Sequence, residues 1–126
     1  MEVRVQSLGG GDPRSMSPLI ADALYRIGQE AIANAVRHAD ASKMVISLIY
    51  EASAWRILIE DDGKGFSSGE DSAGFGIRGM GKRAESIGAT LDIRSSPGKG
   101  TSVQVKVPQA KRLIRYRSRD YDRRMG

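Results

Sequence analysis

The chain contains no cysteine, which excludes a disulfide framework, a thiolate metal site and a catalytic thiol. No apolar run approaches the roughly 18–20 residues that a membrane-spanning helix requires. The first residues, MEVRVQSLGGG, also lack the apolar core of a signal peptide. We therefore expect a cytoplasmic protein with no direct membrane insertion.

An excess of basic charge is absent from most of the chain, although the net charge is +5 over 126 residues. Residues 1–108 carry 13 Lys and Arg against 13 Asp and Glu, whereas residues 109–126 carry seven basic and two acidic residues. The basic stripe of a nucleic-acid-binding fold is missing, so we expect no nucleic acid partner. We predict one domain over 1–108 and a basic tail over 109–126, either a disordered or added end or a segment that binds acidic partners or lipid.

Hydrophobic periodicity predicts two helices and five strands. Apolar side chains from Ile20 to Ala35 recur at helical spacing, with Ser17 as a plausible N-cap and Pro18 at the first helical position. The strands are short and two pairs of them form probable hairpins. The expected strands are 2–8, 44–50, 55–60, 90–94 and 101–107, and the expected helices are 18–38 and 80–87.

This order, strand, helix, two strands, glycine-rich loop, helix and two strands, has few helices and several hairpins. It favours an α+β fold, a two-layer sandwich with the helices on one face of the sheet. Residues 101–107 alternate between apolar and polar side chains, as expected of a sheet with one buried face.

Six of the nineteen residues in 61–79 are glycine and none is proline. Residues 74–79, GFGIRG, match the G-x-G-x-x-G dinucleotide motif, but that motif is meaningful only directly after a strand in a βαβ unit. Here a polar loop precedes it, and the chain has no G-x-x-x-x-G-K-[ST] phosphate loop. Both of these nucleotide-binding folds are therefore excluded.

The glycines still allow a ligand to approach the backbone closely. Gly74, Gly76 and Gly79 precede a helix N-terminus, where N–H groups and the helix dipole favour an anion such as phosphate. Gly63 and Gly65, just after a strand, suggest a second close approach to a flat ligand. A flexible connector is the alternative.

On the long helix, Glu30 and Asn34 are four residues apart and so lie on one side, beside the apolar arc. A carboxylate and an amide at the rim of a core-facing stripe form an oxygen-rich pair that suits Mg²⁺. The alternative is a solvated helix face without a function.

Four motifs occur in one order: EAIANAVRHA at 30–39, DDGKGF at 61–66, GFGIRGM at 74–80 and GKGT at 98–101. Together they resemble the GHKL ATP-binding domain of gyrase-like topoisomerases, heat-shock chaperones, sensor histidine kinases and mismatch-repair proteins. The sequence of residues 26–41 and 76–108 is most similar to the nitrate-sensor and DesK-like class of bacterial sensor kinases. The resemblance covers about residues 18–108 and implies the Bergerat fold, with a mixed, mostly antiparallel sheet.

The resemblance also implies roles for individual residues. Asn34 would hold the Mg²⁺ that bridges the triphosphate, and Asp61 would accept a hydrogen bond from the adenine amine. Thr101 would support adenine through a water shared with Asp61, and residues 66–73 would form the nucleotide lid. Further ATP contacts are expected from Arg37, His38, Gly63, Gly65, Phe66, Gly74, Phe75, Gly76, Ile77, Gly79 and Met80.

Glu30 is the expected catalytic residue. In hydrolysing relatives a glutamate in this position activates water, whereas in a kinase it could polarise the accepting imidazole or assist a metal-bound water. His38, the only histidine, matches a family histidine that is not phosphorylated, so we expect it to cap or partly bury itself near the helix end. Arg37 and Arg83 could neutralise phosphate charge or be solvated cations.

The expected function is that of the Mg·ATP-binding domain of a two-component sensor histidine kinase, the cytoplasmic part of a larger sensor. It would donate the γ-phosphoryl group to a histidine on a separate dimerisation domain, which then charges a response regulator. The chain alone should not autophosphorylate. The alternatives are an anti-sigma factor of the same fold that phosphorylates serine, and a scaffold that binds no nucleotide.

Overall fold

The computed structural model describes residues 1–12, 14, 16–67 and 76–108. Their strands form one five-stranded sheet in the order β1-β2-β3-β5-β4. β1 pairs with β2 in parallel and every other neighbouring pair is antiparallel, which confirms a mixed, mostly antiparallel sheet. The strands are β1 (Glu2–Leu8), β2 (Lys43–Tyr50), β3 (Ala54–Asp61), β4 (Thr90–Ser95) and β5 (Thr101–Pro108).

The long helix α1 (Pro18–Arg37) forms as its sequence predicts. The Ser17 hydroxyl accepts a hydrogen bond from the Ile20 N–H at 3.2 Å and so satisfies one of the unpaired donors of the first turn. His38 is the C-cap, as expected, and its N–H donates to the Asn34 carbonyl. The buried face is an apolar stripe at helical spacing, made of Ala23, Leu24, Ile27, Ala31 and Ala35.

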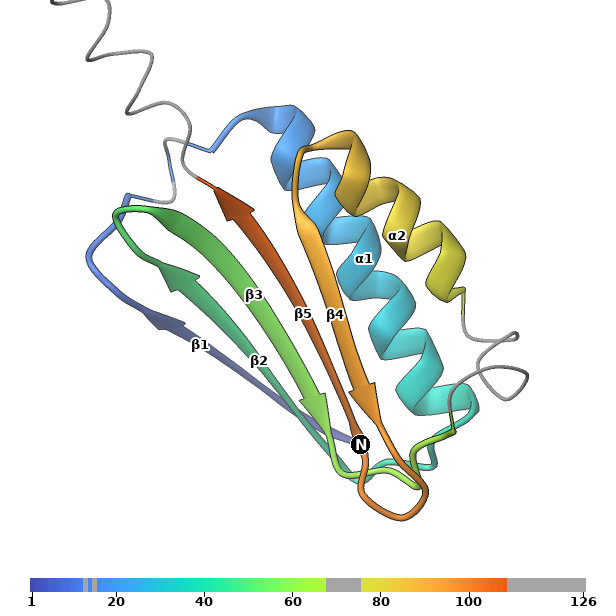
Figure 1. Cartoon of the computed structure of the whole chain (residues 1–126). Helices are drawn as coiled ribbons and strands as arrows, with labels where there is room; N and C mark the ends of the chain where they lie inside the picture. The colour runs from blue at the N-terminus through green and yellow to red at the C-terminus, as the bar shows by residue number, and fades with distance from the viewer. Residues whose placement is uncertain (13, 15, 68–75, 109–126) are drawn as a thin grey trace, which may run out of the picture.

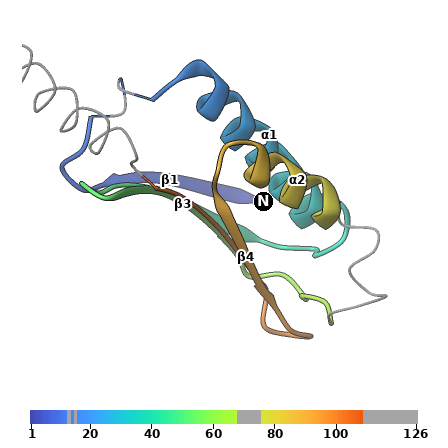
Figure 2. The same cartoon turned by 45° about the horizontal axis from the view of Figure 1, so that its top comes forward.

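Both helices cover the same face of the sheet, so the molecule has the two predicted layers (Figures 1 and 2). The core lies between those layers. Its largest fully buried side chains are Ile27 from α1, Met44 and Ile59 from β2 and β3, and Val105 from β5. Burying each such side chain contributes roughly 1.5–3 kcal/mol, so this seam holds α1 in a fixed place over the sheet.

The second helix, α2 (Ile77–Ser86), begins three residues before the predicted start. Gly76 adopts φ 65°, a left-handed conformation, and serves as its N-cap without a side-chain hydrogen bond. Gly79 was predicted to precede the helix, and this prediction is wrong because Gly79 lies inside it. Glycine is a poor helix former, so the sequence pattern alone placed the boundary too late.

Three connections meet at the end of the sandwich where β3 ends and β5 begins (Figure 1). The Lys64 N–H donates to the Ala39 carbonyl at 2.8 Å, and the Gly98 N–H donates to the Lys64 carbonyl at 2.6 Å. The loop after β3 is thus hydrogen-bonded to the link after α1 on one side and to the β4–β5 turn on the other. Within the described residues, no helix is both long and apolar enough to cross a membrane.

Candidate functional site

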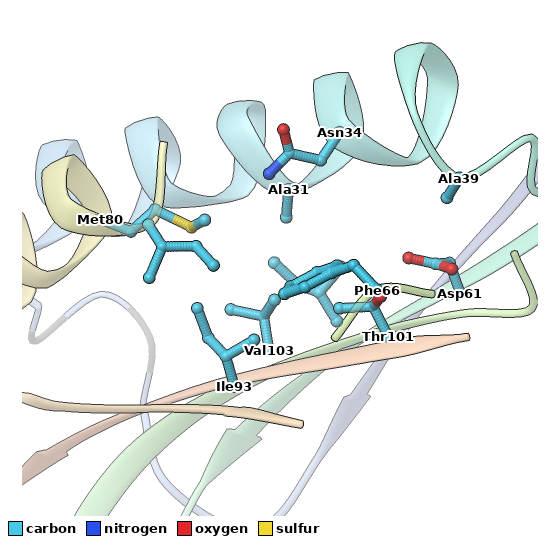
Figure 3. A pocket seen from close by; sticks show the side chains of 11 residues that line it. Ala31, Asn34, Ala39, Asp61, Phe66, Met80, Ile93, Thr101 and Val103 are labelled. Carbon is cyan, nitrogen blue, oxygen red and sulfur yellow. The ribbon is translucent and has the colours of Figure 1, made fainter. Parts of the chain in front are cut away.

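A pocket lies between α1 and the sheet at this end of the molecule (Figure 3). Asp61 lies at one end of it and Met80 at the other, with the Phe66 ring between them and Asn34 on the α1 side. The cavity measures only about 20 Å³, which is room for about one water molecule. A larger ligand enters only if the Phe66 ring or a neighbouring side chain moves. The lining residues are Ala31, Asn34, Ala39, Ile59, Asp61, Phe66, Ile77, Met80, Ile93, Thr101 and Val103.

Asp61 is the acidic group of this pocket. One of its carboxylate oxygens accepts a hydrogen bond from the Gly63 N–H at 2.8 Å. Burial raises the pKa of Asp61 above its usual value, while hydrogen bonds from the backbone of Gly63 and Thr101 act in the opposite direction. Desolvation of a carboxylate strengthens any hydrogen bond it accepts from a ligand, because water no longer competes.

Asp62, the next residue, does not line the pocket and instead hydrogen-bonds to Ser42 and Lys43. Its carboxylate accepts hydrogen bonds from the Ser42 N–H at 2.8 Å, the Ser42 hydroxyl at 2.6 Å and the Lys43 N–H at 2.9 Å. The Ser42 hydroxyl and the two backbone groups lower the pKa of Asp62 to about 2. Asp62 therefore fastens the start of β2 to the end of β3, outside the pocket.

The glycines of the adjoining loops are needed because protein backbone, not open space, surrounds them. A Cβ on Gly63 would lie 2.5 Å from the Ala39 carbonyl oxygen, and one on Gly65, at φ 65°, 2.1 Å from the Ser96 carbonyl oxygen. Gly100, at φ 75°, would place a Cβ 2.1 Å from the Asp61 carbonyl oxygen. Gly100 was missed as a site residue; its signal was the G-K-G spacing in front of Thr101.

Thr101 lies directly opposite Asp61 in the β3–β5 ladder and opposite Ser95 in the β4–β5 ladder. The Ser95 and Thr101 hydroxyl oxygens are 2.8 Å apart. Ser95 also accepts from the Phe66 N–H at 2.9 Å and donates to the Gly100 carbonyl at 3.2 Å. Ser95 is thus the centre of a small network that sequence reasoning missed, because a serine beside a turn gives no distinctive signal.

On the α1 side, the Asn34 side chain reaches the pocket, whereas Glu30, one turn earlier, does not line it. A Cβ on Gly76 would lie 2.4 Å from a Glu30 carboxylate oxygen, so Glu30 lies against the first turn of α2. Within the described part of the chain, no three His, Cys, Asp or Glu side chains are close enough to hold a metal. Asn34, with Glu30 nearby, fits a Mg²⁺ ion whose other oxygen ligands come from phosphate and water.

The structure places several other predicted residues away from the described pocket. Arg37 is exposed and His38 half-buried at the end of α1, and neither lines it. Gly79 is exposed and a Cβ there would meet nothing within 4 Å. Gly74, Phe75 and residues 68–73 of the predicted lid lie outside the described residues, as does the tail 109–126. A ligand contact of any of these residues stays a prediction.

Among the apolar residues that line the pocket, Phe66, Ile77 and Met80 were predicted, whereas five others were not. Ile59, Ile93 and Val103 belong to the sheet, and Ala31 and Ala39 belong to α1 and the link after it. Their alternation and helical spacing predicted burial but could not distinguish a core position from a pocket wall. Because its walls are apolar and Asp61 lies at one end, the pocket suits a flat ring with a hydrogen-bond donor on its edge.

Comparison with known proteins agrees with this geometry. Residues 20–111 match the family described as histidine kinase-, DNA gyrase B- and HSP90-like ATPase. The chain belongs to this family. It is 40% identical over 95 residues to the sensor histidine kinase LiaS of Bacillus subtilis, and 41% identical over 90 residues to the sensor protein VraS of Staphylococcus haemolyticus and of Staphylococcus aureus. These matches cover 71–75% of the chain but only 26% of each relative.

The fold is also that of solved histidine kinase structures. The blue-light activated histidine kinase of Erythrobacter litoralis EL346 matches 90% of this chain, over 37% of its own length, with a TM-score of 0.64 and 22% identity. The histidine kinase domain of the same protein matches 86% of the chain, over 56% of its own length, with a TM-score of 0.63 and 23% identity. These likenesses confirm the predicted fold class. The named relatives are sensor proteins, so the anti-sigma alternative is not favoured.

Proposed function

We propose that residues 1–108 form the Mg·ATP-binding catalytic domain of a two-component sensor histidine kinase. The domain donates the γ-phosphoryl group of ATP to a histidine on a separate helical dimerisation domain, and that histidine then charges a response regulator. The chain spans about a quarter of the length of its relatives named as sensor proteins. In this proposal it is the cytoplasmic ATP-binding part of such a protein.

The adenine end is supported by one observation above all: a partly desolvated carboxylate at the end of an apolar pocket. The Asp61 carboxylate accepts hydrogen bonds from the backbone of Gly63 and Thr101, and its remaining lone pairs can accept one from the exocyclic amine of adenine. Guanine carries a carbonyl at that position, and a carboxylate has no proton to donate to it. The base enters where the Phe66 ring lies, so Phe66 turns aside as ATP binds while its N–H stays on Ser95.

The phosphate end is supported by Asn34, Glu30 and the start of α2. Asn34 would hold Mg²⁺ through its side-chain oxygen, and the ion would supply positive charge that neutralises the triphosphate. The N-terminus of α2, with Ile77 and Met80 beside the pocket, favours the negative phosphates. Glu30, next to Gly76, is within this region and acts on the accepting imidazole or on a metal-bound water.

Titration of the chain with ATP and GTP, each with Mg²⁺ and with a chelator, tests the proposal. We expect ATP to bind and GTP not to bind, and chelation to weaken binding. Asp61→Asn should weaken ATP binding ten- to a hundredfold, because a hydrogen bond to a buried charged acceptor contributes about 1.5–3 kcal/mol. Asp62→Asn is the matched control, since Asp62 lies outside the pocket. Equal ATP affinity of the Asp61 variant and the control would refute the adenine assignment.

Phosphoryl transfer is tested separately with radiolabelled ATP. The chain alone should acquire no label, and a histidine-bearing helical domain from a sensor kinase of the same class should be labelled when it is added. Stoichiometric labelling of His38 in the isolated chain would instead make this chain its own acceptor.

A further inference from the structure

We propose that Ser95 is a positioning residue that sets the selectivity of the pocket for an amino-bearing purine, by fixing the direction of the Thr101 hydroxyl. This inference depends on the proposed adenine site. It adds a residue from β4 that does not line the pocket itself.

Ser95 has three hydrogen-bond partners but only one proton to donate. A serine hydroxyl has one proton to donate and two lone pairs that accept. The Phe66 N–H donates to one lone pair, at 2.9 Å. A carbonyl can only accept, so all three contacts of Ser95 are hydrogen bonds at once only when its proton goes to the Gly100 carbonyl, at 3.2 Å. In that arrangement the contact of 2.8 Å with Thr101 uses the second lone pair of Ser95, and Thr101 is the donor.

With its proton directed at Ser95, the Thr101 hydroxyl presents only lone pairs to the pocket. Thr101 lies directly opposite Asp61 in the ladder, and the Asp61 carboxylate is also an acceptor. The polar corner of the pocket is therefore made of acceptors alone. Such a corner matches an amine or a bridging water that donates twice, and it repels a ring carbonyl.

Ser95 is held in this place by the fold. It is half-buried at the end of β4, directly across from Thr101. Its three partners come from three different segments: the start of the loop after β3, the turn before β5 and β5 itself. The hydroxyl therefore joins the first residue of the predicted lid to the base-recognition corner.

Removing the Ser95 hydroxyl frees the Thr101 proton to turn into the pocket, where it can donate to a carbonyl. We expect Ser95→Ala to weaken ATP binding about fivefold, the loss typical of one hydrogen bond, and to weaken ITP binding less or not at all. ITP is the probe because its base has a carbonyl in place of the adenine amine. The ratio of the ITP to the ATP dissociation constant should thus contract by up to about fivefold.

The experiment measures ATP and ITP affinities by calorimetry, with Mg²⁺, on the full chain and five variants, one of them a double variant. Thermal unfolding of each is the check on folding. Ser96→Ala is the matched control, since Ser96 is the exposed neighbour in the same turn, and should keep the ratio. Ser95→Thr retains a hydroxyl and should restore it. Thr101→Val should contract the ratio with Ser95 intact, so the inference stays testable if Ser95→Ala does not fold.

A purely structural role of Ser95 would weaken ATP and ITP equally and leave the ratio unchanged, which would overturn the inference. In the Thr101→Val background, Ser95→Ala should leave the ratio where it is, because both variants remove the same contact. A further contraction there would also overturn it. If the unaltered chain binds both nucleotides equally or neither, the proposed adenine site fails as well, which separates the two failures.

Discussion

The glycines at the two ends of the candidate site look alike in the sequence and differ in the structure. At the Asp61 end, a Cβ on Gly63, Gly65 or Gly100 would strike a backbone carbonyl at 2.1–2.5 Å. At the α2 end, a Cβ on Gly76 would meet the flexible side chain of Glu30, and one on Gly79 would meet nothing. Backbone cannot move aside without breaking hydrogen bonds, whereas a side chain can.

This difference indicates that the glycines are required for backbone packing at the Asp61 end but not at the α2 end. The Asp61 end is built by segments packed backbone to backbone and fastened by hydrogen bonds between Lys64, Ala39 and Gly98. Such packing holds a carboxylate at a fixed place before any ligand binds, as base selection requires. At the α2 end, Gly76 is explained by its left-handed φ of 65° at the N-cap, and packing within the described residues does not explain Gly79. A close approach of phosphate to these two glycines stays a prediction.

The largest effect should come from Gly100→Ala. It combines a positive φ with a collision against the Asp61 carbonyl, so we expect a loss of about 3 kcal/mol or more in the free energy of unfolding. Gly98→Ala is the matched control: Gly98 has φ 79° in the same turn but no atom within 4 Å of a Cβ. It should lose only about 1–2 kcal/mol, from backbone strain alone. Urea unfolding measures both, and equal losses would contradict the packing argument.

A smaller effect of opposite sign is expected for Gly79→Ala. Gly79 is exposed inside α2, so alanine should stabilise the fold by up to about 1 kcal/mol through helix propensity. Gly81→Ala, two residues later in the same helix and also without a neighbour within 4 Å, should stabilise similarly. If Gly79 contacts the phosphates as predicted, only Gly79→Ala weakens ATP binding. Unchanged affinity in both variants would remove Gly79 from the site.

The smallest effect concerns the neighbouring carboxylates and the response to acid. The pKa of Asp62 lies at about 2 in the folded chain, below its ordinary 3.8. Its contribution to stability is therefore complete above the ordinary value and is lost as the pH falls toward 2. Asp62→Asn should flatten the acid limb of stability against pH, measured by urea unfolding. An unchanged acid limb would mean that Asp62 does not fasten β2 to β3.

The pKa of Asp61 is shifted in the opposite direction. Because burial raises its pKa, the folded chain takes up this proton at a higher pH than an ordinary aspartate, and protonation does not destabilise the fold. The two adjacent residues are thus distinguishable by their acid behaviour, and only Asp61 was predicted to contact adenine.

Much of the architecture could be predicted from the sequence, because it depends on local patterns. Ser17 and Pro18 set the start of α1, the apolar stripe from Leu24 to Ala35 set its buried face, and the alternation in β5 set the orientation of that strand. The start of α2 could not be predicted, because Gly76 acts through a left-handed backbone angle that no spacing reveals.

The sequence by itself determined the layers, the order of the strands and helices along the chain, and the residue types that point to a nucleotide. Only the tertiary structure decided that Asp61 turns into the pocket while Asp62 turns out, that Ser95 joins Phe66 to Thr101, and that Gly63 and Gly100 pack against backbone. The physical reason is sequence separation. Periodicity reports what neighbours within one element share, whereas the site is made by segments from distant parts of the chain that meet at one end of the sheet. Phe66 and Ser95, for example, are 29 residues apart.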